Sequence, residues 1–449
     1  MIDVKGKKIS IIGAVKSGLG AARLVKKLGG IPFVTDSAPK EKIEKNLTIL
    51  DQEQIDYEYG NHSERAFDCE FIITSPGVPS EAGILVAARE RGIKIISEVE
   101  FASAFCKGKI ISITGTNGKT TTTSLCAHVL NECGAKTYLA GNIGIAFSDI
   151  VLDVKEDEFV ALETSSFQLD YIQDFKPRIS TILNITPDHL DRYDHNIQNY
   201  IDSKLNVFRN QDEQDYLILN ADDSRTSDNI SNASVNKFYF SLNKEIENGA
   251  SLQDGKLVYR NKGVVEYELS TDKFSLKGEH NYANAMAVII VAKILNLDNE
   301  KISAALGNFP GVEHRLEFVR KLDGVTFIND SKATNVDSVW YALRSFEEPI
   351  FLILGGKDKG NDYNQIKDLV IERVKKIYAI GSSADKVFNF FHALVKVEIK
   401  PTLEDCVNSA SSEARENDVV LLSPACASFD MFNDYEHRGR VFKEAVNKL

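Results

Sequence analysis

One short string in this chain has the residue types and spacing to bind phosphate. Residues 115–120 read GTNGKT and directly follow an apolar run at 110–113. A glycine turn between a buried strand and a helix start directs several backbone N–H groups at one concavity, where the helix dipole adds positive potential. Lys119 adds a mobile charge, and Thr120 offers a hydroxyl to the Mg²⁺ that accompanies a nucleotide. Position 113 is isoleucine where the general pattern has glycine, yet a plain glycine turn does not account for Lys119 and Thr120. The string therefore predicts a nucleotide site.

Three further side chains could complete a metal site beside this loop. Glu163 ends an apolar run at 159–163, His189 follows another at 180–184, and Lys204 lies fifteen positions after the histidine. In doubly wound sheets ligands gather at the carboxyl ends of strands, and Mg²⁺ takes oxygen ligands together with substrate phosphates. Each residue also has an ordinary interpretation: Glu163 in a helix-starting cluster, His189 as a structural histidine and Lys204 as a solvated helix lysine.

Two polar strings follow apolar runs near the C-terminus. Residues 329–335 read NDSKATN, and a buried strand that enters so many polar residues must satisfy them all. A capping loop could do this, but Lys332 would then have little purpose. Residues 423–430 read SPACASFD, whose small side chains allow a ligand to approach closely. We interpret Cys426 as a small buried filler rather than a catalytic thiol.

The N-terminal residues form a second candidate nucleotide site. An apolar strand at 8–13 is followed by glycines at 13, 18 and 20, a helix to about residue 28, and a strand at 32–36 that ends in Asp36. This resembles the dinucleotide fingerprint, in which an acidic residue about 20 positions on meets a ribose. Because the spacing is not G-x-G-x-x-G, the pattern favours a nucleotide diphosphate other than NAD.

Alternating strands and helices must position these residues, and the length suggests about three domains of roughly 150 residues. We predict an α/β protein with a Rossmann-like parallel sheet in residues 1–106, a P-loop ATPase-type domain in 107–311 and a doubly wound Rossmann-like domain in 312–449. The second domain would contain an alternating β segment at 237–274, with a hairpin turn at 254–255, and a long apolar helix at 280–297. Four buried strands would build the third domain.

Bulk composition excludes several function classes. The chain has 449 residues, a net charge of −12 and 43% hydrophobic residues, which is ordinary for a globular protein. Such acidity argues against a nucleic-acid partner. The six cysteines lack metal-ligand spacing and indicate reduced thiols in a cytoplasmic protein. We expect neither a signal peptide nor a membrane-spanning segment.

The residues alone predict an ATP- and Mg²⁺-using transferase or ligase. One outer domain would hold an anionic, nucleotide-like ligand. The other outer domain, at Lys332 and Lys359, would hold an acid.

Taken together, the strings at 115–120, 329–335 and 423–430 resemble the Mur ligases, the ATP-dependent amide-forming enzymes of bacterial peptidoglycan assembly. Glu163 and Lys204, with His189, also match motifs shared across that family. The resemblance covers essentially the whole chain, and the last two strings resemble the D-glutamate-adding members. It implies a ligase that adds D-glutamate to UDP-N-acetylmuramoyl-L-alanine through an acyl phosphate, with ATP and two Mg²⁺ ions. We expect this enzyme to be a monomer and to act in the cytoplasm.

The same resemblance implies roles for individual residues. Catalysis would depend on Lys119, His189 and Lys204, with Lys204 carrying a carbamate that serves as an anionic metal ligand. The metal ligands would be Thr120, Glu163, His189 and Lys204. ATP would be held by Gly115, Thr116, Asn117, Gly118, Lys119, Thr120, Thr121, Asn281, Asn284, His314, Arg315 and Asp330. D-Glutamate would be held by Lys332, Thr334, Lys359, Ser428 and Tyr435, and the uridine diphosphate end of the other substrate by Ser17, Gly18 and Asp36. Asn142 would be a further substrate-binding residue.

Two positions depart from the family pattern. The loop GGKDKG at 355–360 is more basic than expected, which leaves open whether Lys357 or Lys359 meets the glutamate side chain. Tyr435 stands where phenylalanine is expected and adds a hydroxyl at a stacking position.

Three other function classes stay open at this point. Folylpolyglutamate synthases share the central chemistry but lack the N-terminal α/β domain. A nucleotide-dependent sensor without amide synthesis would need neither Lys332 nor Lys359. A nicotinamide dehydrogenase using residues 8–36 would leave the phosphate loop at 115–120 unexplained.

Overall fold

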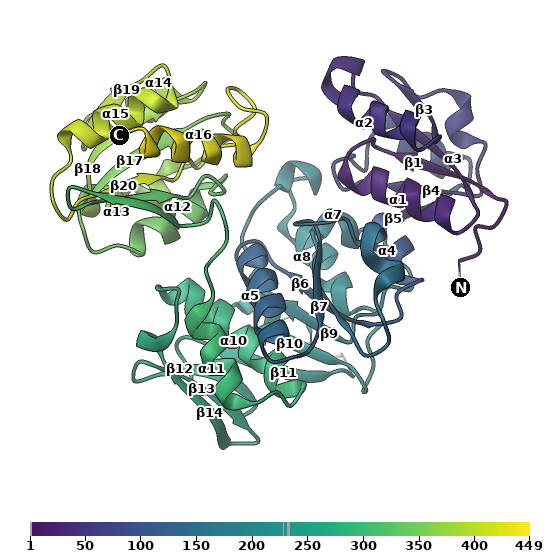
Figure 1. Ribbon diagram of the computed structural model, residues 1–449, viewed down its shortest axis with the longest axis horizontal. Helices are drawn as coiled ribbons and strands as arrows, with labels where there is room; N and C mark the ends of the chain where they lie inside the picture. The colour runs from purple at the N-terminus through teal and green to yellow at the C-terminus, as the bar shows by residue number, and fades with distance from the viewer. Residues whose placement is uncertain (1, 228, 231–233) are drawn as a thin grey trace. The chain divides into compact units, whose positions relative to one another are not determined.

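The computed structural model describes residues 2–227, 229–230 and 234–449. The chain separates into two compact units, one made of Met1–Ser275 with Asn281–Phe309, and the other of Leu276–His280 with Pro310–Leu449. Two β-sheets lie in the first unit and one in the second, and helices pack on all three (Figure 1). Among the described residues, no helix is both long and apolar enough to cross a membrane.

The first sheet has five parallel strands in the order β3-β2-β1-β4-β5. Its elements are β1 Lys8–Ile12, α1 Lys16–Lys27, β2 Ile31–Asp36, α2 Lys40–Gln52, β3 Asp56–Tyr59, η1 Glu64–Phe67, β4 Phe71–Thr74, α3 Gly83–Glu90, β5 Lys94–Ser97 and α4 Glu98–Ser103. The turn between β1 and α1 is tight, because a Cβ at Gly18 would lie 1.8 Å from the carbonyl oxygen of Gly13. Only glycine therefore allows the helix to start so close to the strand.

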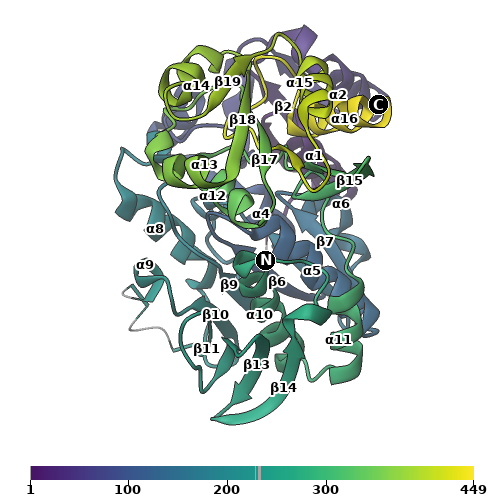
Figure 2. The same ribbon diagram turned by 90° about the vertical axis from the view of Figure 1, so that its left-hand side faces the viewer.

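The central sheet has nine strands in the order β14-β13-β12-β11-β10-β9-β6-β8-β7. Its strands are β6 Lys109–Thr114, β7 Thr137–Gly141, β8 Phe159–Glu163, β9 Ile179–Ile182, β10 Tyr216–Asn220, β11 Asn236–Ser241, β12 Gly249–Gln253, β13 Lys256–Asn261 and β14 Val264–Ser270. Its helices are α5 Lys119–Glu132, α6 Phe147–Ile150, η2 Val151–Asp153, α7 Ser166–Leu169, η3 Leu190–Arg192, α8 Ile197–Leu205, η4 Asn206–Phe208, α9 Ser224–Ser227, η5 Thr271–Lys273, α10 Glu279–Ile294 and α11 Asn299–Asn308. In this order the strands from β12 to β7, β6 included, run parallel. Strand β13 is antiparallel to both of its neighbours, β12 and β14, and β14 lies at the edge (Figure 2).

The predicted hairpin in this sheet is confirmed. Asp254 and Gly255 join β12 to β13 with φ values of +44° and +72°, and Gln253 pairs with Lys256 across the turn. Two successive positive φ values are what a two-residue hairpin loop requires. The Asp-Gly pair therefore fixes the register of the last strands.

The third sheet has six strands in the order β15-β16-β20-β17-β18-β19, of which only β15 is antiparallel. Its elements are β15 Glu317–Leu322, β16 Val325–Asn329, α12 Val336–Arg344, β17 Ile350–Gly355, η6 Tyr363–Ile366, α13 Lys367–Arg373, β18 Val374–Ile380, α14 Ala384–Phe391, β19 Lys396–Ile399, α15 Leu403–Glu413, β20 Val419–Leu422 and α16 Tyr435–Asn447. Successive side chains of β17 enter two different cores. Leu352 and Leu354 pack with α12, α13 and α14, whereas Phe351 and Ile353 pack with α15 and α16. Both faces of the sheet are thus covered, which explains its uninterrupted apolar strands.

The first two sheets share one apolar core, and two glutamates of α4 strengthen the connection. Glu98 Oε1 accepts the backbone N–H and the hydroxyl of Ser148, each at 2.6 Å. Glu100 accepts three successive backbone N–H groups of residues 173–175, each at 2.9 Å. Phe101, the next residue of α4, belongs to the same core as Ile9 of β1 and Val160 of β8. These contacts explain why the two sheets form one unit.

The predicted architecture, three α/β regions built on parallel sheets, is confirmed, and the boundaries near residues 106 and 311 remain predictions. Four strands were not expected from the sequence: β3, β7, β15 and β19. All four lie at an edge of a sheet. Edge strands are partly exposed, so they lack the continuous apolar run that identified the inner strands.

Candidate active site

The loop between β6 and α5 has the backbone of a phosphate-binding turn. Gly115 and Gly118 adopt φ values of +154° and +82°, and Gly118 is the N-cap of α5. A side chain at Gly118 would meet Asn284 Oδ1 at 2.6 Å, so the turn closes only with glycine. The hydroxyl-bearing Thr120 and Thr121 then lie in the first turn of α5, and both are buried. The predicted strand, turn and helix are therefore all present.

Two side chains that sequence reasoning did not select hold this loop in place. Asn184 follows β9, and its carbonyl and side-chain oxygens accept the N–H groups of Thr116 and Asn117, each at 2.8 Å. The hydroxyl of Tyr200, on α8, lies 3.2 Å from the hydroxyl of Thr116. An asparagine at a strand end was a weak signal for Asn184. Nothing in the helical pattern indicated the contact of Tyr200, because it joins residues 84 positions apart.

Two lysine side chains meet at one carbonyl oxygen of the loop. Lys119 Nζ and Lys204 Nζ both donate to the oxygen of Gly115, each at 2.8 Å. Lys204 is only 1% exposed, so its alternative interpretation as a solvated helix lysine is wrong. Burial, followed by the charge of Lys119, lowers the pKa of Lys204 well below its usual value. Two ammonium groups so close together repel each other. The repulsion favours a neutral amine on Lys204, or an anion bound between the two lysines.

Glu163 ends β8 with a carboxylate that is buried and only half satisfied. Oε1 accepts a hydrogen bond of 2.8 Å from Asn142 Nδ2, in the loop after β7. Oε2 is buried and has no hydrogen-bond partner among the described residues. An unpartnered carboxylate oxygen is costly inside a protein, and it is the kind of ligand that Mg²⁺ prefers. The chemistry of Glu163 Oε2 therefore fits a ligand of a magnesium ion.

His189 lies after β9, near the strand ends that carry the loop and Glu163. Its backbone has φ of +53°, and its N–H donates to the side chain of Asp188 at 2.9 Å. Its ring packs edge-on against Phe167 of α7, with the centroids 5.2 Å apart. Because α7 starts three residues after Glu163, this contact holds the histidine beside the end of β8.

The remaining predicted residues of the first unit lie at two places. Asn281 and Asn284 are buried on α10, and Asn284 contacts the phosphate loop at Gly118. Ser17 lies at the start of α1, where Asp36 at the end of β2 accepts the N–H of Ala14 at 2.7 Å. Asp36 thus shapes the turn in front of α1. Ser17 and Asp36 thus lie at the strand ends of the first sheet, whereas Asn281 and Asn284 lie on a helix of the central region.

In the second unit, Tyr435 holds Lys332. Lys332 Nζ donates to the hydroxyl of Tyr435 at 3.3 Å and lies 5.1 Å from the centre of its ring. The hydroxyl that distinguishes Tyr435 from phenylalanine thus positions this lysine. Ser428 is buried after β20, and Thr334 is half-buried after β16. Lys359 is exposed in the loop after β17, so the strand ends of β16, β17 and β20 carry these residues.

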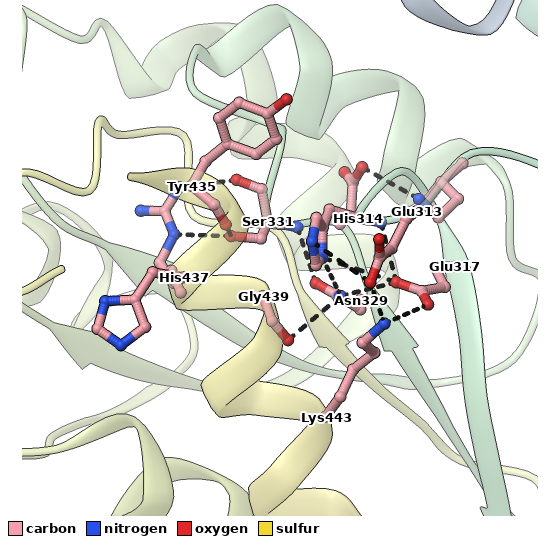
Figure 3. A network of polar contacts seen from close by, with 12 residues as sticks. Glu313, His314, Glu317, Asn329, Ser331, Tyr435, His437, Gly439 and Lys443 are labelled. Atoms are coloured by element: carbon pink, nitrogen blue, oxygen red, sulfur yellow. Dashed lines mark hydrogen bonds and ion pairs between the residues drawn. The ribbon is translucent and has the colours of Figure 1, made fainter. Parts of the chain in front are cut away.

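Arg438 joins two of these strand ends, a role that the sequence did not reveal. Its side chain is 2% exposed and donates to the carbonyl oxygens of Ser331 at 2.7 Å and Cys426 at 3.1 Å. It also donates to the Ser331 hydroxyl at 3.0 Å. The guanidinium therefore fixes the loop after β16 to the loop after β20. Figure 3 shows Ser331 beside Tyr435.

Asp330 is a buried carboxyl between the same loops. It accepts hydrogen bonds from Leu316 N–H at 3.2 Å and from the hydroxyl of Ser423 at 2.9 Å. Burial raises the pKa of Asp330 from 3.8 to about 6. Because the folded pKa is the higher one, this group stabilises the fold fully below pH 4, and the contribution is lost as the pH rises through about 6.

Asp330→Asn should therefore flatten the pH dependence of stability. The amide is neutral at every pH, so the fall in unfolding free energy between pH 4 and pH 8 should shrink by up to about 3 kcal/mol. Trp340, the only tryptophan of the chain, lies on α12 and reports unfolding of this unit by fluorescence. Asp385→Asn, on the exposed side of α14, is the matched control. An Asp330→Asn profile parallel to that of the unaltered protein would contradict the assignment.

Family models match three stretches of this chain. The MurD N-terminal domain matches residues 8–84, the Mur ligase middle domain 113–292, and the Mur ligase glutamate ligase domain 314–426. The chain belongs to the Mur ligase family. The resemblance drawn from the sequence strings is thereby confirmed.

Curated Mur ligases align with essentially the whole chain. The UDP-N-acetylmuramoylalanine--D-glutamate ligase of Salinibacter ruber is 42% identical over 458 residues, covering 100% of this chain and 99% of that protein. The protein of the same name from Christiangramia forsetii is 44% identical over 449 residues, covering 99% of this chain and 100% of its own length.

Solved Mur ligase structures share the fold at lower identity. UDP-N-acetylmuramate-alanine ligase MurC from Thermotoga maritima gives a TM-score of 0.65 at 20% identity, covering 98% of this chain and 99% of its own. MurF ligase from the same organism, in complex with ADP, gives a TM-score of 0.60 at 13% identity, covering 99% and 96%. These two similarities concern the fold alone.

Proposed function

We propose that this protein joins D-glutamate to UDP-N-acetylmuramoyl-L-alanine with consumption of ATP, in the synthesis of peptidoglycan precursors. The observation that carries the proposal is the identity of 42% and 44% to ligases of that name over essentially the full chain. The chemistry of the strand ends supports it, because one unit offers a phosphate loop with acidic and basic groups. The other offers a lysine held beside hydroxyl groups.

The proposed reaction has two steps. An oxygen of the substrate carboxylate attacks the γ-phosphorus of ATP, which forms an acyl phosphate and releases ADP. The amine of D-glutamate then attacks the acyl carbon, a C–N bond forms, the C–O bond to phosphate breaks, and the amine loses a proton. Both steps bring anions together, so they require positive charge and N–H donors around the phosphates. Lys119 and the backbone of Gly115–Gly118 supply these groups.

The nucleotide would be held mainly by the loop and its neighbours. We assign Gly115, Thr116, Asn117, Gly118, Lys119, Thr120, Thr121, Asn281, Asn284, Arg315 and Asp330 to ATP. The buried side chains of Asn281 and Asn284 support this, because Asn284 already contacts the loop. Ser17, Gly18, Asp36 and Asn142 are assigned to the UDP-sugar.

Two Mg²⁺ ions would bind at Thr120, Glu163, His189 and a modified Lys204. When bound, the ions neutralise charge on the phosphates. The buried Glu163 Oε2, which has no hydrogen-bond partner in the part of the chain that the structure describes, supports a metal ligand there. Lys204 would carry a carbamate, because an ammonium beside Lys119 and two metal ions is repelled, whereas the carbamate is an anionic oxygen ligand.

D-Glutamate would bind in the second unit, at Lys332, Thr334, Lys359, Ser428 and Tyr435. Tyr435 holds the ammonium of Lys332, which suits a carboxylate of the amino acid. We also propose that the enzyme acts in the cytoplasm, where ATP and nucleotide sugars are found. A monomer suffices, because one chain carries every residue assigned to the reaction.

D-Glutamate should be the only acceptor that supports rapid phosphate release from ATP in the presence of UDP-N-acetylmuramoyl-L-alanine. L-Glutamate, lysine and D-alanine should give less than about one hundredth of that rate, because buried polar groups that fit one acid are left unpaired by the others. Lys332→Ala should lower turnover with D-glutamate at least about a hundredfold while leaving nucleotide-sugar binding unchanged. Equal activity with lysine as acceptor would contradict the assignment. Lys321→Ala, on β15 and exposed, is the control.

A further inference from the structure

His314 is buried although it lies in a turn that carries proposed nucleotide residues. Its side chain is only 3% exposed. The backbone of His314 has φ of +65° and that of Leu316 +44°. Positive φ is uncommon for such residues, and two in one short turn persist only where the surroundings hold them.

The backbone of this turn is tied to the loop after β16. The carbonyl oxygen of His314 accepts the N–H of Lys332 at 3.0 Å. The N–H of Leu316 donates to Asp330 at 3.2 Å, and the N–H of His314 donates to Glu317 Oε2 at 2.9 Å. One turn thus fixes Arg315 on one side and the main chain of Lys332 on the other.

Asn329 determines the state of the His314 ring (Figure 3). The Asn329 oxygen accepts the N–H of Ser331 at 3.2 Å, which fixes which side-chain atom is the amide nitrogen. That nitrogen donates to Glu317 Oε2 at 2.9 Å and lies 2.9 Å from His314 Nδ1. An amide nitrogen has no lone pair to offer, so Nδ1 must be the acceptor and the ring hydrogen must lie on Nε2.

Helix α16 packs against the His314 ring, and Lys443 of the same helix neutralises the two glutamates beside it. A Cβ at Gly439 would come within 2.2 Å of Nδ1, so α16 packs directly on the imidazole. Glu313, His314 and Glu317 bring their ligand atoms within 4.8 Å of one another, as a metal site would. The ammonium of Lys443 already serves as the cation, because it donates to Glu313 at 2.5 Å and to Glu317 at 2.9 Å.

We propose that His314 positions Arg315 and Lys332 rather than contacting the nucleotide, and that Asn329 holds its imidazole in the neutral form protonated at Nε2. The identity of what Arg315 and Lys332 bind rests on the proposed ligase function. His314 then connects Arg315, on the nucleotide side of this unit, with Lys332, on the amino-acid side. The charged groups facing the ring are Glu313, Glu317, Glu436 and Lys443.

Two substitutions of His314 distinguish a positioning role from direct contact with the nucleotide. An asparagine side chain places its oxygen where Nδ1 lies and tolerates positive φ, whereas a glutamine reaches the position of Nε2. A positioning role predicts that His314→Asn keeps both KM values, for ATP and for D-glutamate, within about threefold of the unaltered enzyme. His314→Gln should raise both KM values about tenfold, the effect of one lost buried hydrogen bond. His392→Asn and His392→Gln, on the exposed end of α14, are matched controls.

Opposite results would overturn the proposal. If His314 contacted ATP through Nε2, His314→Gln would be the better variant, and only the KM for ATP would rise. Equal KM values for both variants and the unaltered enzyme would also contradict a positioning role.

The ring state is measured without any substrate. In the ¹⁵N-labelled chain, the signals that disappear in His314→Asn should show an unprotonated Nδ1 and a protonated Nε2 at neutral pH. Asn329→Asp replaces the donor with an acceptor and should move the hydrogen to Nδ1, whereas Asn408→Asp, exposed on α15, should change nothing. A protonated Nδ1 in the unaltered protein, or an unchanged ring signal in Asn329→Asp, would overturn the inference.

Because these spectra need no turnover, a failure of the ligase assay and a failure of the ring assignment are distinguishable. If Asn329→Asp fails to fold, Gly439→Ala tests the same contact, since its Cβ must displace the ring from Asn329. An unchanged ring signal in Gly439→Ala would likewise overturn the inference.

Discussion

Lys204→Arg should be almost inactive, with turnover lowered about a thousandfold or more. Arginine keeps the positive charge but cannot form a carbamate. The proposed carbamate arises when the neutral amine attacks the carbon of CO₂, an N–C bond forms and one N–H proton leaves to solvent. Burial and the nearby Lys119 favour that neutral amine, because they lower the pKa of Lys204. Loss of one anionic metal ligand should raise the activation free energy by about 4 kcal/mol, which corresponds to a roughly thousandfold lower turnover.

Lys204→Ala should be equally poor and should recover in part with formate or acetate. Each of these anions can bring a carboxylate oxygen to the vacated ligand position. The modification itself is observed by adding ¹³C-labelled bicarbonate to the unaltered protein, where one carbamate signal should appear that Lys204→Arg lacks. Lys301→Arg, on the exposed face of α11, is the matched control and should keep full activity. Near-normal turnover in Lys204→Arg would exclude the carbamate.

Glu163→Gln should show the second-largest effect, a loss of turnover of about a hundredfold to a thousandfold. Glutamine keeps the shape and can still accept from Asn142, so the contact at Oε1 survives. It removes the charge at Oε2, the buried oxygen that we assign to Mg²⁺ because none of the described residues forms a hydrogen bond with it. A neutral amide binds Mg²⁺ poorly in comparison with a carboxylate.

The dependence on magnesium concentration distinguishes this role from a structural one. In Glu163→Gln, the Mg²⁺ concentration for half-maximal rate should rise at least about tenfold, and excess Mg²⁺ should recover part of the activity. Glu132→Gln, at the exposed end of α5, should behave like the unaltered enzyme. If Glu163→Gln lost activity with an unchanged Mg²⁺ requirement, Glu163 would not be a metal ligand.

Local sequence was sufficient wherever a signal lay within one element or one turn. The run of apolar residues before Gly115 and the lysine after Gly118 defined strand, turn and helix, because φ > 0 and an N-terminal cap are properties of adjacent residues. The same holds for the hairpin at Asp254 and Gly255. Edge strands such as β3 and β19 gave no such signal, since their exposed faces accept polar residues.

For residues far apart in the chain, the sequence predicted the strand end at which they lie but not which atoms are in contact. The sequence placed Lys332 and Tyr435 in one site, yet only the structure shows the tyrosine hydroxyl accepting from the lysine. Arg438 is a buried connector of two loops, a contact that no local pattern indicated. His314 was expected to face the nucleotide, and the structure places its ring inside the unit.

The sequence by itself determined the family, the strand ends that carry chemistry and the residue types gathered there. Only the tertiary structure decided which of these groups meet, as Lys119 and Lys204 do at the carbonyl oxygen of Gly115 across 85 residues of chain. The physical reason is that some properties depend on residues adjacent in the chain and others on residues distant in the chain. Backbone conformation follows from neighbours, whereas burial and protonation state depend on what the folded chain packs around a side chain.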